Sequence, residues 1–125
     1  MSLSDLIPKK TIICTSCRQR YTDRRIFGDC LEAEGIPSSG IVKLEHGTEV
    51  HVGDIVHCTK YAGMISSYLK KVLEIKNDLI IVGTAYVNPD KDFSFPAAEI
   101  LGVAVEVMDD NRNVVWRRSD YVGEN

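Results

Sequence analysis

The chain has 125 residues and a formal net charge of −3, and 44% of its residues are hydrophobic while 26% are charged. This length supports one hydrophobic core, so we expect a single domain over residues 1–125. The acidic balance argues against the basic surface that direct DNA binding requires. No apolar run is long enough to cross a membrane, and the first residues do not form a signal peptide, so we expect a cytoplasmic protein without membrane contact.

The first quarter of the chain predicts little regular structure. Residues 1–10 are polar and contain Pro8, which resists helix and sheet, so we expect them to be flexible. A β-branched run at residues 11–15 predicts a short strand. The strongly polar residues 18–25 are interpreted as a loop that can hold one helical turn, leading into a strand at residues 25–27.

From residue 28 onward the sequence predicts strands separated by turns. Residues 31–34 are good helix formers followed by Gly35, which predicts one turn of helix. The turn-forming residues 76–78 predict a hairpin, and the segment 93–96 is expected to cover the core. The predicted strands cover residues 41–44, 55–59, 64–75, 79–83, 100–108 and 114–117.

The segment 100–108 has the clearest strand alternation, which places Val103, Val105 and Val107 on one face. About eight strands and one helical turn are expected in total. We therefore predict an all-β fold: a small, rolled, mostly antiparallel sheet with at most one short helix. Neither an internal repeat nor a low-complexity linker divides it.

The cysteines, at positions 14, 17, 30 and 58, fit reduced thiols better than a disulfide framework. Cys14 and Cys17 have the C-x-x-C spacing of a zinc clip, but a structural zinc site needs four ligands and the chain has no second such pair. We expect these two thiols to pack as small hydrophobic groups, with no metal and no other cofactor. A zinc-clipped binding module, completed by Cys30 or His46, is kept as an alternative hypothesis.

Three glycine-led segments form the most informative motif of the chain. Residues 28–31, with the sequence Gly-Asp-Cys-Leu, form a corner that exposes the side chain after the aspartate. Residues 35–36, Gly-Ile, close a short turn. Residues 53–56, Gly-Asp-Ile-Val, lead into a β-branched strand.

These segments resemble the LexA-like peptidase domain of SOS and phage repressors and of UmuD-type proteins, in the signal-peptidase-like superfamily. That family has a Gly-Asp-Ser-Met corner with a nucleophilic serine, then a Gly-Ile, a Gly-Asp-x-Val strand, and a strand lysine that acts as base. The resemblance extends from about residue 26 to about residue 107 and implies a fold like that of the LexA C-terminal domain. It places Cys30 at the serine position, among the site-forming residues Gly28, Asp29, Leu31 and Gly35.

The resemblance leaves the base open. Matching residues 68–72 and the hairpin after them puts Lys70 at the base position. A register shift of one residue gives Lys71 instead, whose side chain faces the other side of the sheet. Matching residues 65–68 puts Ser66 there and leaves no base. The structural alternative is that both lysines are solvated residues on an edge strand.

Cys30 is the candidate nucleophile, and its chemistry is also open. A thiolate attacks better than a neutral hydroxyl, so a cysteine need not abolish activity, yet a cysteine and lysine pair has a different charge balance from a serine and lysine pair. A buried cysteine in an inactive site is the alternative. A pair of Cys30 with His57 is a weaker hypothesis, and His46 and His51 are expected to be exposed.

Three residues outside this pair receive structural roles. The carboxylates of Asp29 and Asp54 are expected to bond the backbone at turns. Trp116 is expected in the core or at a dimer contact, because the apolar strand 114–116 is suited to pairing with a second copy.

The leading hypothesis is a stand-alone LexA-like domain of phage-repressor or UmuD type, from a prophage or mobile element and connected with the SOS response. Fewer than thirty residues precede Cys30, so no helix-turn-helix domain is expected there. No Ala-Gly or Cys-Gly bond precedes Cys30 either, so self-cleavage is not expected. We expect a homodimeric interaction module that binds a protein partner through a degenerate peptidase site. The alternative is an active peptidase with Cys30 as nucleophile and Lys70 as base.

Overall fold

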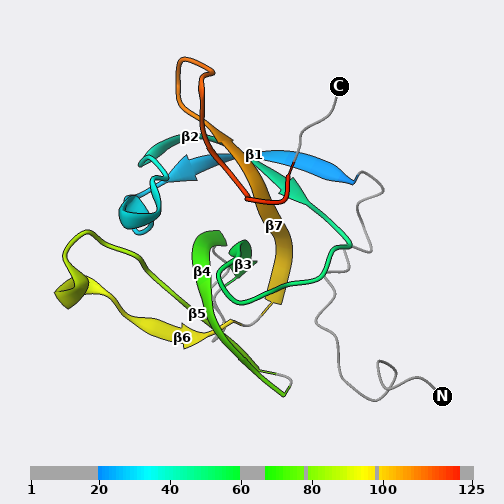
Figure 1. The fold of residues 1–125 in the computed structure, drawn as a ribbon, viewed down its shortest axis with the longest axis vertical. Helices are drawn as coiled ribbons and strands as arrows, with labels where there is room; N and C mark the ends of the chain where they lie inside the picture. Colours follow the sequence, from blue (N-terminus) through cyan, green and yellow to red (C-terminus); the bar gives the residue numbers. More distant parts are fainter. Residues whose placement is uncertain (1–19, 60–66, 78, 98, 122–125) are drawn as a thin grey trace.

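The computed structural model describes residues 20–59, 67–77, 79–97 and 99–121, which form one eight-stranded sheet (Figure 1). Its strands are β1 (Tyr21–Phe27), β2 (Ser39–Glu45), β3 (Ile55–Thr59), β4 (Ser67–Lys76), β5 (Leu79–Gly83), β6 (Ser94–Pro96), β7 (Glu99–Met108) and β8 (Val114–Arg117). Two single 3₁₀ turns, η2 (Glu32–Glu34) and η3 (Pro89–Lys91), are the helices of the described residues. None of these helices has the length and apolar character needed to cross a membrane. The all-β fold expected from the sequence is confirmed.

The strand order is β1-β2-β7-β3-β4-β5-β6, with β8 also paired to β7, and every pairing is antiparallel. Strand β7 lies between β2 on one side and β3 and β8 on the other, as Figure 1 shows where it crosses the molecule. β3 pairs with the first half of β7 and β8 with its second half. Register shifts interrupt four of these ladders, and such bulges bend strands and roll the sheet.

The core consists of two clusters of buried side chains. The first contains Ile26, Leu31, Ile36, Val42, Leu44, Ile55, Ala85, Ala104 and Val107. The second contains Val50, Val56, Cys58, Val72, Ile80, Val82 and Val103. Partly buried Trp116 packs against the first cluster, in agreement with its expected place in the core.

The expectation that Val103, Val105 and Val107 share one face is wrong. Val103 packs in the second cluster, whereas Val107 packs in the first together with Ala104. In the ladder between β2 and β7, Lys43 pairs with Glu106 and Leu44 pairs with Ala104, so Val105 has no partner on β2. This extra residue reverses the alternation of side chains, so one strand supplies both clusters.

The loop expected over residues 18–25 is also wrong, because β1 begins at Tyr21 and pairs along its whole length with β2. β1 forms one edge of the sheet, and its charged side chains stay exposed. An edge strand tolerates such charges, so polarity alone did not indicate a loop. The strand expected at residues 11–15 lies outside the described residues.

Most other expected elements are confirmed. Strands β3, β5 and β8 have the predicted bounds, and the segment after Phe93 forms β6 against β5. η2 ends at Gly35, whose φ of 82° is the left-handed conformation that glycine adopts easily. The hairpin between β4 and β5 turns at Asn77, with a φ of 55°. η3 adds a second helical turn to the one expected.

Gly40 lies close to the backbone of Met108 on β7, and its replacement tests this packing. Its φ is 139°, and an added Cβ would overlap the Met108 carbonyl oxygen. We expect Gly40→Ala to lower the free energy of unfolding by about 3 kcal/mol, because strain and overlap add. Gly35→Ala is the matched control, since Gly35 also has a positive φ but open space at Cβ. It should cost only about 1 kcal/mol in urea denaturation; equal losses for the two variants would contradict the close approach.

Candidate functional site

The corner that carries Cys30 is held by backbone bonds of its own. Gly28 begins it with a φ of 92°, and the Asp29 carbonyl accepts a hydrogen bond from Glu32 N at 3.2 Å. The side chain of Leu31 is buried in the first core cluster and anchors the corner. Gly35 N donates to the Glu32 carbonyl at 3.1 Å and closes the turn. Cys30 is thereby held half-buried between an exposed aspartate and a buried leucine.

The segment after β5 fastens this corner to the sheet. Ala85 N donates to the Cys30 carbonyl at 2.6 Å, and Ala33 N donates to the Ala85 carbonyl at 2.7 Å. The Glu32 carboxylate accepts a third bond from Val87 N at 2.9 Å. The position of Cys30 is therefore fixed by two main-chain bonds and one side-chain bond to the segment after β5.

The Cys30 thiol lies against β4. Its Sγ donates a hydrogen bond to the Leu69 carbonyl at 3.3 Å. The ladder between β4 and β5 begins at Lys71, so Leu69 has no partner residue on β5. At Leu69, Cys30 lies next to β4 instead. The structure thus brings the predicted nucleophile to the residue directly before Lys70.

Lys70 is buried, with 5% of its surface exposed. Its Nζ lies 5.1 Å from the ring centroid of Phe93 and 5.9 Å from that of Phe95, which are cation–π distances. Lys71 points elsewhere, and its Nζ makes a 3.1 Å ion pair with Glu34 of η2. The alternative of two solvated lysines on an edge strand is wrong, because β4 lies between β3 and β5.

Cys58 is a neighbour of this site that the sequence analysis did not place there. Burial raises the pKa of the Cys58 thiol to about 11, although the charge of Lys70 opposes this shift, and nearby Cys30 adds to it. Cys58 is consequently a neutral thiol at neutral pH, and both Lys70 and Cys30 lie within electrostatic reach of it. The pairing of β3 with β4 could have indicated this proximity, because Val56 lies opposite Lys70 and Cys58 is two residues further on.

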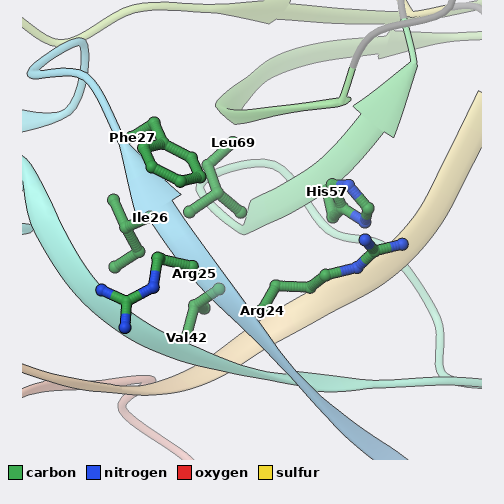
Figure 2. A pocket seen from close by; sticks show the side chains of 7 residues that line it. All are labelled: Arg24, Arg25, Ile26, Phe27, Val42, His57 and Leu69. Carbon is green, nitrogen blue, oxygen red and sulfur yellow. The ribbon is translucent and has the colours of Figure 1, made fainter.

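His57 belongs to a different feature, a cavity of about 210 Å³ between β1, β2, β3 and β4 (Figure 2). Its side chain is buried, and burial, then the charges of Arg24 and His46, lower its pKa to about 4. His57 lies opposite Leu69 across the ladder, but no hydrogen bond joins His57 to Cys30 among the described contacts. The proposed pair of Cys30 with His57 is therefore not formed.

The other two histidines have structural contacts. His46 is half-buried rather than exposed as expected, because its Nε2 lies 2.6 Å from Thr22 Oγ1 and its Nδ1 donates to the Leu101 carbonyl at 2.8 Å. His51 is exposed, as expected, and lies beside Glu49 and Asp54.

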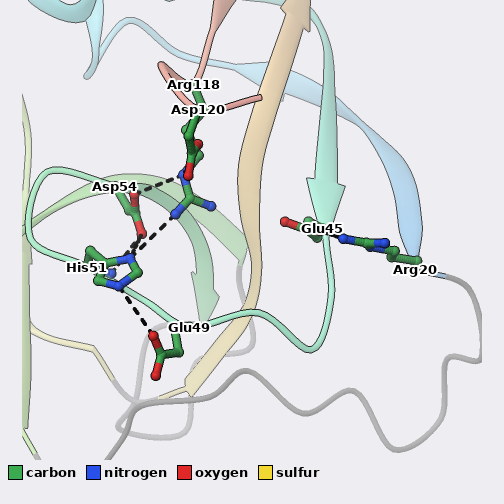
Figure 3. Close-up of polar contacts among 7 residues, drawn as sticks. All are labelled: Arg20, Glu45, Glu49, His51, Asp54, Arg118 and Asp120. Carbon is green, nitrogen blue, oxygen red and sulfur yellow. Dashed lines mark hydrogen bonds and ion pairs between the residues drawn. The ribbon is translucent and has the colours of Figure 1, made fainter. Parts of the chain in front are cut away.

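Asp54 joins the Gly-Asp corner before β3 to the segment after β8 (Figure 3). Its Oδ2 accepts a hydrogen bond from His51 N at 2.7 Å, so the expected backbone bond is confirmed. Its Oδ1 lies 3.4 Å from Arg118 Nε, which also contacts Asp120 at 3.0 Å. Asp29 differs, since its backbone carbonyl, and not its carboxylate, accepts the turn bond from Glu32 N.

Metal binding finds no support in this part of the chain. Among the described residues, no cluster of histidine, cysteine, aspartate and glutamate side chains is arranged to hold an ion. Cys14 and Cys17 lie outside the described residues, as does Ser66.

Comparison with known proteins gives no match, whether to a family model, to a curated protein or to a solved structure.

Arg118 provides a test of the link at Asp54. The Asp54 side chain is only 9% exposed, so losing its cation leaves a poorly solvated carboxylate. We expect Arg118→Met to lower the free energy of unfolding by about 2 kcal/mol. Arg117→Met is the matched control, because the Arg117 pair with Glu106 involves a half-exposed guanidinium and should be worth below about 1 kcal/mol. Similar denaturation midpoints for the two variants would argue against the link.

Proposed function

We propose that this chain forms a LexA-like domain of phage-repressor or UmuD type, which acts as a homodimeric interaction module for a protein partner. In this proposal the peptidase corner is degenerate, kept for its shape and not for catalysis. A prophage or mobile element with a connection to the SOS response is the proposed setting. Support comes from the Gly-Asp-Cys-Leu corner beside a buried strand lysine, on an all-β fold.

The hydrogen bond from Cys30 to Leu69 is the observation on which the degenerate site depends. A thiol can donate this bond only while it keeps its proton, and the thiolate that a nucleophile requires would face a carbonyl oxygen. The bond therefore directs the thiol hydrogen at a backbone carbonyl and not at a general base. This favours an inactive corner over an activated one.

The surroundings of Lys70 support the same proposal. Its Nζ lies against the rings of Phe93 and Phe95 at cation–π distances. A general base must lie within hydrogen-bond reach of the proton that it accepts, whereas the Cys30 thiol bonds to the Leu69 carbonyl.

An active cysteine peptidase is the second candidate function. It is favoured by the shared neighbourhood of Cys30 and Lys70, since both act on the thiol of Cys58. In this alternative Cys30 is the nucleophile, Lys70 is the base, and the substrate is another chain.

Thiol labelling separates the two candidates. A maleimide probe at pH 6, followed by mass-spectrometric mapping of each cysteine, reports the reactivity of Cys30 in the native protein. We expect slow labelling of Cys30 that is unchanged in Lys70→Met. Cys58 serves as the internal control and should resist labelling even at pH 8, because its pKa is about 11. Fast labelling of Cys30 at pH 6 that is lost in Lys70→Met would support the peptidase instead.

Dimerisation is proposed through β8. β8 pairs only with β7 among the described strands, and it exposes Val114 and Val115, whereas the edge strand β1 exposes charged residues. An apolar strand edge is suited to pairing with an identical strand from a second copy, which forms a two-fold interface.

Sedimentation velocity tests this interface. At micromolar concentration we expect a dimer of the 14.0 kDa chain. Val115→Lys should dissociate it, because a lysine facing its own copy brings like charges together. Leu79→Lys is the matched control, since Leu79 and Val115 are both 44% exposed but Leu79 lies at the far hairpin of β5. A monomer at all concentrations would count against the dimer.

A further inference from the structure

The cavity beside His57 combines one polar side with apolar walls (Figure 2). Arg24 and His57 form the polar side, and Figure 2 shows the Arg24 guanidinium next to the His57 ring while Arg25 points away from it. The apolar walls are the side chains of Ile26, Phe27, Val42 and Leu69. The cavity is thus amphipathic, with its charge at one end.

His57 is 4% exposed, yet its ring nitrogens form no hydrogen bond with any described residue. These nitrogens are not fully enclosed by the protein. Among the described residues, the only side-chain nitrogen or oxygen that is both fully enclosed and without a hydrogen-bond partner is Tyr121 Oη. The remaining exposed surface of His57 faces the cavity that it lines. A buried polar side chain of this kind is normally satisfied, so the unmet hydrogen bond points to a ligand.

Arg24, which is exposed, supplies the positive charge next to His57 in the cavity. Two arginines close to it in the sequence have carboxylate partners. Arg20 pairs with Glu45 at 2.8 Å, and Arg25 lies 3.9 Å from Asp110. Among the described residues the Arg24 guanidinium has no carboxylate and no hydrogen-bond acceptor. Its positive charge instead acts on His57, where it lowers the ring pKa.

We propose that this cavity binds a small carboxylate with an apolar body. The carboxylate would accept a two-pronged contact from the Arg24 guanidinium and a hydrogen bond from the neutral His57 ring. Its body would lie against Ile26, Val42 and Leu69. A single unpaired cation favours a monoanion over a phosphate dianion, which recruits more positive groups.

The volume limits the size of the body. A cavity of about 150 Å³ holds benzene, and pockets for drug-sized ligands begin at about 300 Å³. At about 210 Å³ the cavity fits a ring or a branched chain with one carboxylate. This chemistry occurs both in free aromatic acids and in the C-terminal residue of a peptide. The site is separate from the Cys30 corner and does not depend on the function proposed above.

Nuclear magnetic resonance of the histidine rings tests the proposal directly, with benzoate as the probe. Benzoate should shift the ring signals of His57 and raise its pKa above about 4, because a bound anion favours the protonated ring. Benzamide, which has the same shape without the charge, should leave both unchanged. His51, exposed and remote from the cavity wall, is the internal reference. No shift of His57 with benzoate, or an equal shift with benzamide, would overturn the carboxylate site.

Arginine variants then test the residue assignment. Arg24→Gln should weaken benzoate binding about tenfold, the effect of losing one charge-assisted contact. Arg25→Gln is the matched control, because Arg25 lies on the same strand and lines the same cavity but points away from His57. It should change the affinity less than about threefold. Equal losses in the two variants would overturn the role of Arg24.

The source of the carboxylate is resolved with a peptide. N-acetyl-glycyl-phenylalanine and its C-terminal amide are compared with benzoate in the same titration. Tighter binding of the free-acid peptide supports a peptide C-terminus as the natural ligand, and tighter binding of benzoate supports a free acid. Equal binding of the peptide and its amide would overturn carboxylate recognition in the peptide.

Discussion

Strand β7 holds the two parts of the sheet together, because in the described chain it pairs with β2, β3 and β8. Its bulge at Val105 shifts the alternation of side chains, so Val103 packs in the second cluster and Val107 joins Ala104 in the first. A regular strand would have placed Val103 and Val107 on the same side. This bulge is one of the four register shifts that bend the strands and roll the sheet.

The pairing of β3 with β4 positions both sites considered above. Leu69 has two roles: its carbonyl accepts the hydrogen bond from Cys30, and its side chain lines the cavity of His57. His57 lies directly opposite it on β3. The adjacent residues Lys70 and Cys58 face the other side of the ladder, where the aromatic rings of the β6 region lie. Two chemically different surroundings therefore arise on the two faces of one strand pair.

Local chemistry in the sequence was enough to predict much of the sheet. Turn-forming residues fixed the ends of β3, β5 and β8, and the glycine after η2 ended that turn as expected. The resemblance, and not local chemistry, grouped Cys30 with Lys70, and the structure brings the Cys30 thiol to the carbonyl of Leu69 on β4.

The features that were missed depend on which strands become neighbours. β1 has the polarity of a loop, and only its position at an edge explains why it is a strand. The reversal at Val105 requires the partner strand to be known, because nothing in the valine pattern marks the extra residue. Burial of His57 and Cys58 likewise follows from packing across the sheet. Pairing between distant segments is set by the whole core, and a single sequence does not record it.

The shape of the corner at residues 28–35 is determined without the side chain of Cys30. Its bonds come from the main chain at Ala33, Gly35 and Ala85, and an ion pair between Glu34 and Lys71 ties the turn to β4. A different small residue at position 30 would therefore stand at the same point in space, facing the same strand. Such a frame separates the chemistry offered at one position from the main-chain architecture that presents it. The corner can therefore present different reactive groups at one fixed position beside β4.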